Sequence, residues 1–123
     1  MDSAEKQQLV ERYIAACNAF DVEAMLATLS ADVVFRDFRD GQLAAQCSGR
    51  EAFAQLSKQA NAMFSECEQI ITAMREMGDS LAVGIACHGT FAAGVAAGSV
   101  FERAGLLEFS FDNECIRLLV SRA

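Results

Sequence analysis

Two neighbouring stretches decide the fold of this chain: VERYIAACNAFD at residues 10–21 and VVFRD at residues 33–37. In the first, apolar residues recur at the spacing of one helix face, and Asp21 stands where a capping residue begins a second short helix. The second is β-branched and aromatic, as strands are, and ends in Asp37. Strict alternation places Asp37 on the apolar face of that strand, where a carboxylate is costly unless it is paired or used.

The rest of the chain continues with one more helix and then strands. A capping pair, Asp2 with Glu5, begins the first helix, and the second helix extends to Leu29. A capping box of Ser48 and Glu51 predicts the start of a third helix, whose apolar face includes Phe53, Leu56, Ala60, Met63 and Phe64. The predicted strands are 33–38, 42–47, 67–77, 81–92, 101–111 and 115–120, with a loop at 94–98. This order is typical of an α+β fold in which the helices cover one face of an antiparallel sheet.

The length and the net charge of the chain limit its number of domains and its kinds of partner. The length of 123 residues predicts one domain, 1–123, and 53% hydrophobic residues are enough for a real core. A formal net charge of -7, with no basic cluster, repels phosphate backbones and anionic lipid surfaces. We therefore expect no nucleic-acid partner and no membrane partner.

Cysteine spacing and the polar N-terminus predict the compartment. The five cysteines are odd in number and contain no C-x-x-C pair, so we expect free thiols and no metal site. The first residues resemble neither a signal peptide nor a transit peptide, and no apolar run is long enough to span a membrane. These features favour a cytoplasmic protein.

Taken together, the pieces resemble the nuclear transport factor 2-like superfamily, and within it the SnoaL-like and ketosteroid isomerase-like proteins. The resemblance spans nearly the whole chain and rests on the order of RYIAACNAFD (12–21), VFRD (34–37), SG (48–49) and FSFDN (109–113). It implies a cone-shaped fold, with N-terminal helices packed on a strongly curved, mostly antiparallel sheet around an apolar cavity. It also implies a homodimer formed through the outer face of the sheet.

The resemblance assigns roles to two residues. In ketosteroid isomerases a helix-borne tyrosine donates a hydrogen bond to the developing enolate oxygen, and an aspartate on the early strand moves a proton between carbons. Tyr13 and Asp37 fall on those positions. Leu107 stands at the counterpart of the family's second acid, with Glu108 on the opposite face. Losing one such donor typically costs ~100-fold or more in rate, which argues against steroid isomerisation specifically.

Two interpretations remain open. In the first, an isomerase or cyclase without a cofactor uses Asp37 as general base and Tyr13 as hydrogen-bond donor. In the alternative, the same cavity belongs to a non-catalytic ligand-binding or dimerisation domain. Asp37 is then an edge carboxylate paired with Arg36, Arg39 or a backbone amide, and Tyr13 is a core tyrosine.

In either case we expect a cavity that binds a small apolar molecule. Besides Tyr13 and Asp37, its predicted walls are Cys17, Phe35, Phe53, Met63, Val83, Ile85, Cys87, Leu107 and Phe109. His88 falls on the other face of its strand and is expected to point toward solvent or a dimer partner.

Overall fold

The structure is a computed structural model that describes residues 1–92, 94 and 96–123. Its elements are α1 (Ser3–Asn18), α2 (Val22–Leu26), β1 (Leu29–Arg39), β2 (Gln42–Ser48), α3 (Arg50–Ala62), β3 (Phe64–Met77), β4 (Ser80–Phe91), β5 (Val100–Asp112) and β6 (Cys115–Arg122). Of the predicted loop at 94–98, Val95 lies outside the described residues. No described helix is long and apolar enough to cross a membrane.

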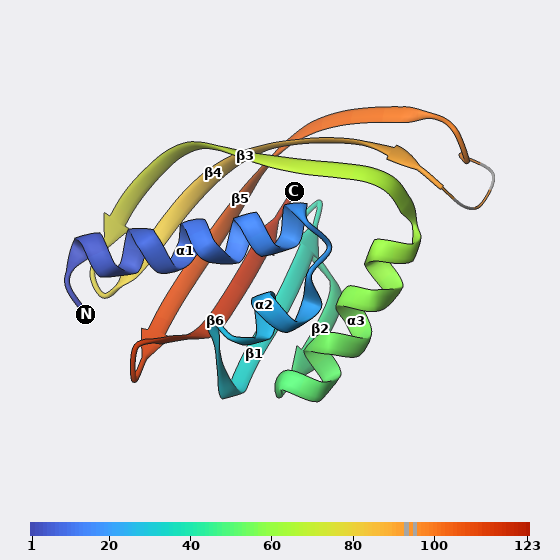
Figure 1. The fold of residues 1–123 in the computed structure, drawn as a ribbon. Coiled ribbons are helices and arrows are strands. Elements are labelled where there is room, and N and C mark those ends of the chain that lie inside the picture. Colours follow the sequence, from blue (N-terminus) through green and yellow to red (C-terminus); the bar gives the residue numbers. More distant parts are fainter. Residues whose placement is uncertain (93, 95) are drawn as a thin grey trace.

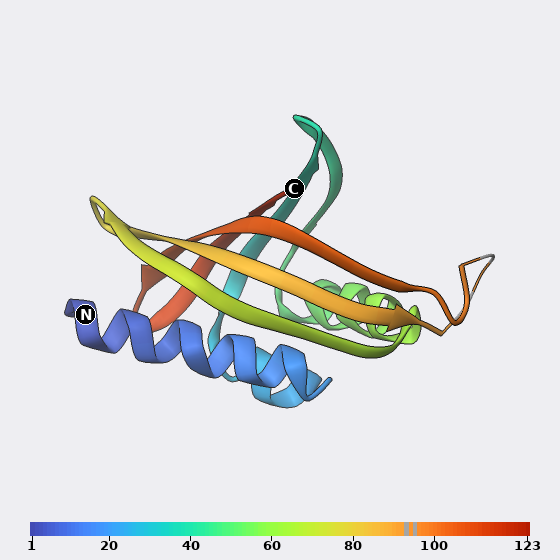
Figure 2. The same ribbon diagram turned by 90° about the horizontal axis from the view of Figure 1, so that it is seen from above.

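All six strands form one sheet in the order β2-β1-β6-β5-β4-β3 (Figure 1). Neighbouring strands are antiparallel except β1 and β6, which are parallel. The sheet is strongly curved, and the helices lie on its concave side (Figure 2). The predicted α+β architecture, with helices on one face of a curved and mostly antiparallel sheet, is confirmed.

The local helix signals that the sequence predicted are present at the first two helices. The Asp2 side chain accepts a hydrogen bond from the Glu5 N–H at 2.8 Å, and the Glu5 side chain accepts from the Asp2 N–H, which completes the capping box. Asp21 caps α2 by accepting from the Ala24 N–H at 3.1 Å. Both caps depend on contacts within three residues, so the sequence alone identifies them.

Three predicted helix boundaries were wrong because the residues concerned pair with a neighbouring strand or lead directly out of one. Ser48 is the last residue of β2, where it pairs with Val34, and Gly49 is the N-cap of α3 without a side-chain cap. The Gly49 backbone has a φ of 88°, a conformation that glycine adopts readily. Leu29 begins β1 opposite Ile116 instead of ending the second helix. Phe64 is the first residue of β3 and does not belong to the third helix.

Two sets of hydrogen bonds hold the helices to the sheet. The Arg50 guanidinium donates to the Leu29 carbonyl through Nε at 2.9 Å and through Nη2 at 2.6 Å, which fixes the start of α3 against β1. The Asn18 side chain exchanges two hydrogen bonds with the Gln69 backbone, which fixes the end of α1 against β3. Between these anchors the helices enclose part of the concave face.

The core lies where α1 crosses the sheet. Val10 and Tyr13 of α1 are buried there against Val83 of β4 and Phe109 of β5. The Tyr13 and Phe109 rings meet edge to face, with centroids 5.8 Å apart. Because α1 fills this half of the concavity, open space remains only toward α3.

Candidate functional site

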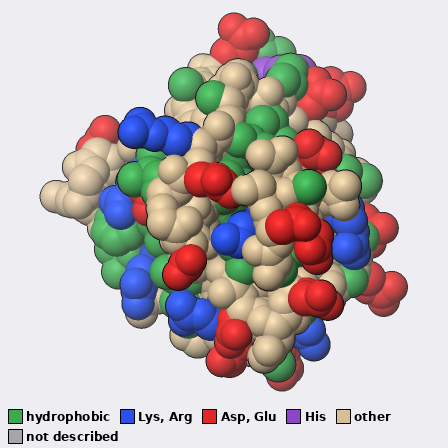
Figure 3. Space-filling model, turned by 90° about the vertical axis from the view of Figure 1, so that its left-hand side faces the viewer, with side chains coloured by type: hydrophobic (Ala, Val, Ile, Leu, Met, Phe, Trp, Pro, Cys, Tyr) green, Lys and Arg blue, Asp and Glu red, His purple; other side chains and the backbone are tan. Residues whose placement is uncertain are grey.

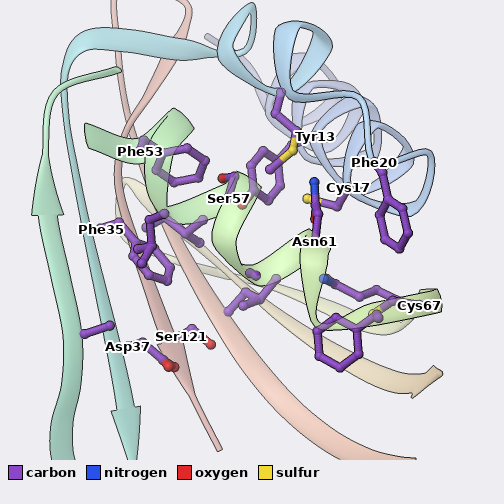
Figure 4. Close-up of a pocket in the computed structure, with 18 of the residues that line it drawn as sticks. Tyr13, Cys17, Phe20, Phe35, Asp37, Phe53, Ser57, Asn61, Cys67 and Ser121 are labelled. Atoms are coloured by element: carbon purple, nitrogen blue, oxygen red, sulfur yellow. The ribbon is translucent and has the colours of Figure 1, made fainter. Parts of the chain in front are cut away.

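A cavity of about 300 Å³ lies between α1, α3 and the concave face of the sheet (Figure 4). This volume is in the range of small-molecule sites in proteins. Its walls are mostly apolar and include Phe20, Phe35, Phe53 and Phe64. The cavity suits a small, largely apolar molecule.

The structure brings six of the predicted site residues together in these walls. They are Tyr13, Cys17, Phe35, Asp37, Phe53 and Leu107. Five predicted wall residues lie outside the lining, and they are Met63, Val83, Ile85, Cys87 and Phe109. Val83 and Phe109 are fully buried in the core, and Met63, the C-cap of α3, is 43% exposed. Alternation along a strand identified the inward face correctly but not the part of that face that a helix covers.

The sequence interpretation missed several polar lining residues. They are Arg39 on β1, Ser57 and Asn61 on α3, Gln69 on β3 and Ser121 on β6. Gln69 could have been identified from the sequence by alternation. It is a polar residue on the same strand face as Cys67 and Ile71, which pack inward. The position of Ser121 beside Asp37 depends on the pairing of β6 with β1, which the sequence does not indicate.

Asp37 stands in a row of side chains that crosses four strands. It pairs with Ala45 on β2 and with Ser121 on β6, and Ser121 pairs with Leu107 on β5. All four residues line the cavity. The β1–β2 register shifts directly after Asp37. Such bulges are common beside functional sites because they re-aim a side chain.

The Asp37 carboxylate is anchored through one oxygen only. Its Oδ2 accepts a hydrogen bond from Arg39 Nε at 3.1 Å, while 13% of its side chain is exposed. Its Oδ1 is buried and has no hydrogen-bond partner among the described residues. One oxygen of this cavity-lining residue therefore has no hydrogen bond within the described chain.

Tyr13 lines the same cavity from α1. Figure 4 shows Asp37 near Ser121 and Tyr13 away from both, and no hydrogen bond in the described chain joins Tyr13 to Asp37. Burial raises the pKa of the Tyr13 phenol well above its usual 10.0, and the nearby Cys17 thiol adds to this effect. The hydroxyl is therefore protonated at neutral pH.

The cavity thiols are protonated as well. Burial raises the pKa of Cys17 to about 12, and burial together with Cys87 raises the pKa of Cys67 to about 11. A thiol, unlike a thiolate, is a poor nucleophile. The site therefore offers a carboxylate and a phenol for chemistry, and no activated cysteine.

His88 lies outside the cavity. Its Nε2 is 2.9 Å from Glu68 Oε1 on the neighbouring strand, and its side chain is 47% exposed. Figure 3 shows the one histidine of the chain at an edge of the surface with acidic side chains near it. Within residues 1–92, 94 and 96–123, no group of three His, Cys, Asp or Glu side chains is placed to hold a metal ion.

Solved structures share this fold over nearly the whole chain. A protein from Xanthomonas campestris pv. campestris, provisionally assigned as a polyketide cyclase, superimposes with a TM-score of 0.81 at 24% identity, covering 98% of this chain and 90% of its own. An NTF2-like protein of unknown function from Burkholderia pseudomallei K96243 gives a TM-score of 0.82 at 18% identity, with coverage of 98% and 90%. An LEH-like epoxide hydrolase from M. tuberculosis gives 0.76 at 17% identity, with coverage of 97% and 82%.

These neighbours establish the fold, and the family follows from the sequence. No curated protein matches the chain. The SnoaL-like domain matches residues 10–118, which include Tyr13, Asp37 and most of the cavity lining. The chain therefore belongs to the SnoaL-like domain family, within the NTF2-like fold.

Proposed function

We propose that this protein binds a small, largely apolar carbonyl compound in the cavity and moves one of its protons, as an isomerase or a cyclase does. The observation that carries the proposal is that Asp37 lines the cavity and that its buried Oδ1 has no partner among the described residues. A general base needs an oxygen that is free to take a proton. The carboxylate meets this need while Arg39 holds its other oxygen.

The proposed step begins at a carbon next to the substrate carbonyl. Asp37 Oδ1 takes a proton from that carbon, and the bonding electron pair moves toward the carbonyl oxygen to form an enolate. The proposed step requires the substrate to lie between Asp37 and Tyr13, so that Tyr13 donates a hydrogen bond to this oxygen as its charge develops. Return of the proton to another carbon completes an isomerisation. Attack of the enolate carbon on a second carbonyl forms an alkoxide, and transfer of the proton from Asp37 to that oxygen completes a cyclisation.

The missing second acid limits the expected power of the site. Leu107 lines the cavity where the resemblance puts that acid, so Tyr13 is the one family donor retained. The expected catalysis is therefore weaker than that of a two-donor oxyanion site. The mostly apolar wall also suits the alternative, a binding domain that holds its ligand without turnover.

Isomerisation of a small β,γ-unsaturated ketone tests the proposal. In 3-cyclohexenone the carbon between the carbonyl and the double bond loses a proton, and the conjugated 2-cyclohexenone that forms absorbs in the ultraviolet. We expect the wild-type protein to accelerate this conversion and Asp37→Asn to abolish the acceleration. A wild-type protein that binds the ketone without converting it would instead favour the binding domain.

A further inference from the structure

The cavity contains a second buried oxygen that has no hydrogen-bond partner. Among the described residues only Asp37 Oδ1 and Gln69 Oε1 are in this state, and both residues line the same cavity. Leaving a buried acceptor unpaired is costly, so native proteins pair such atoms with a protein group, a water or a ligand. Two unpaired acceptors on residues that line one cavity therefore point to two positions at which a bound molecule would pair with the protein.

The backbone of Gln69 is held in place independently of its side chain. Asn18 Nδ2 donates to the Gln69 carbonyl at 3.0 Å, and the Gln69 N–H donates to Asn18 Oδ1 at 2.8 Å. These two bonds fix Gln69 against the end of α1. The side-chain amide thus starts from an anchored backbone, as a selective contact requires.

Packing does not explain an amide at this position. Gln69 shares the inward face of β3 with Cys67 and Ile71, where an apolar side chain would fill the same space without an unpaired oxygen. The unpaired amide of Gln69 therefore lowers the stability of the protein when no ligand is bound. A ligand group that pairs with the amide offsets that cost.

Asp37 and Gln69 approach the cavity from distant strands. Asp37 lies on β1 and Gln69 lies on β3, and the sheet order puts β6, β5 and β4 between them. The curvature of the sheet turns both strands toward one cavity (Figure 2). A single molecule that satisfies both oxygens must carry polar groups at two separate points.

We propose that Gln69 is a specificity-determining residue that binds a hydroxyl group of the ligand, at a point remote from the atoms on which Asp37 acts. A hydroxyl matches an amide because both groups donate and accept hydrogen bonds. A neutral group fits because Asp37 and Arg39, the charged residues of the lining, are already paired with each other. This inference rests on the proposed function, since it assigns a second contact for the same ligand in the same cavity.

The test compares two neutral ketones that differ by one hydroxyl. Binding of 2-tetralone and 6-hydroxy-2-tetralone is measured by calorimetry with the wild-type protein and with Gln69→Met. One neutral hydrogen bond corresponds to ~3- to 10-fold in affinity, so we expect the wild type to prefer the hydroxylated ketone by about that factor. In Gln69→Met the preference disappears, so that the variant binds the two ketones with equal affinity.

Two further variants control the comparison. Gln55→Met changes an exposed glutamine of α3 that does not line the cavity, and it keeps the wild-type preference. Gln69→Leu repeats the test with different packing in case the methionine variant does not fold.

The possible outcomes test the role of Gln69 separately from the role of Asp37. Equal wild-type affinities for the two ketones, or a preference that persists in both Gln69 variants, would overturn the role of Gln69. Failure of the wild type to bind either ketone would overturn it too. A hydroxyl preference that depends on Gln69, in a protein that does not move protons, would uphold the inference and overturn the proposed function alone.

Discussion

Asp37 and Arg39 lie two residues apart on β1 and are joined by one hydrogen bond, from Arg39 Nε to Asp37 Oδ2 at 3.1 Å. An arginine that bound the carboxylate in a two-pronged fashion would occupy both oxygens. The one-point contact instead orients the carboxylate and leaves the buried Oδ1 without a partner among the described residues. This relationship is the structural basis for proposing Asp37 as a general base.

Removing the Tyr13 hydroxyl tests its role as the oxyanion donor. In Tyr13→Phe we expect the rate of proton transfer to fall by about 100-fold, the usual effect of losing one such donor, and by less than in Asp37→Asn. The ring contacts with Phe53 and Phe109 remain, so the free energy of unfolding in urea should change by less than about 1 kcal/mol. An unchanged rate in a folded variant would remove Tyr13 from the mechanism.

Stability at alkaline pH should report the buried cavity groups. Burial raises the pKa of Cys17 from 9.0 to about 12 in the folded chain, so the unfolded chain loses this proton first as the pH rises. The contribution is fully present below pH 9.0 and is lost progressively between pH 9.0 and about 12. The slope is at most about 1.4 kcal/mol per pH unit for one group.

Tyr13 and Cys67 also make stability fall as the pH rises, because their pKa values are raised in the folded chain. Urea titrations across this pH range should therefore show stability falling as the pH rises. Cys17→Ala should make the fall shallower. A stability that is constant up to pH 12, or an equal slope in the variant, would contradict the burial of this thiol.

The convex face of the sheet leads us to expect a homodimer. Ile70 and Leu106 are 48% and 38% exposed there, and Ala86 and Ala104 lie beside Ile70 in register across β4 and β5. Exposed apolar patches usually mark interfaces, and two-fold dimers are the commonest assembly. Light scattering at micromolar concentration should give twice the mass of the chain.

A charge in that patch should separate the copies. We expect Ile70→Glu to shift the protein toward monomer. Leu43→Glu, which changes a 50% exposed residue of β2, should leave the dimer intact. A wild-type monomer, or equal behaviour of the two variants, would exclude an interface at this patch.

The five cysteines are expected to be free thiols, and no metal is expected to be bound. Thiol titration after denaturation without reductant should count five. The two sulfurs of Cys67 and Cys87 are 3.8 Å apart, so treatment with diamide should lower the count by two, and Cys87→Ser should prevent that loss. A count of three before any oxidant, or zinc in elemental analysis, would show that the cysteine spacing was misinterpreted.

The local parts of the fold were predictable from the sequence. The capping box of Asp2 and Glu5 and the cap at Asp21 depend on neighbours three residues away, and the structure contains both. Ser48 carried an equally good local signal, yet its pairing with Val34 keeps it in β2. A local pattern fails where a distant strand competes for the same backbone.

The site was predictable only in part. Alternation along β1 put Asp37 inward, and the helical stripe of α1 put Tyr13 inward. The cavity, however, depends on which portion of the concave face α1 covers, so Val83 and Phe109 are core instead of walls. The wall beside Asp37 also depends on the parallel pairing of β1 with β6, which brings Ser121 next to it and leaves no local trace in the sequence.

The most direct test of the account is proton exchange at a carbon next to a carbonyl. The protons at C1 of 2-tetralone exchange with deuterium in D₂O, and NMR follows the rate without requiring a complete reaction. The account predicts that the wild-type protein accelerates this exchange and that Asp37→Asn lowers the acceleration by about 10³-fold, as expected for loss of a general base. The control Asp40→Asn changes an exposed aspartate outside the cavity lining and should keep the wild-type rate. Equal exchange rates for the wild type and folded Asp37→Asn would contradict the central claim that Asp37 is the base.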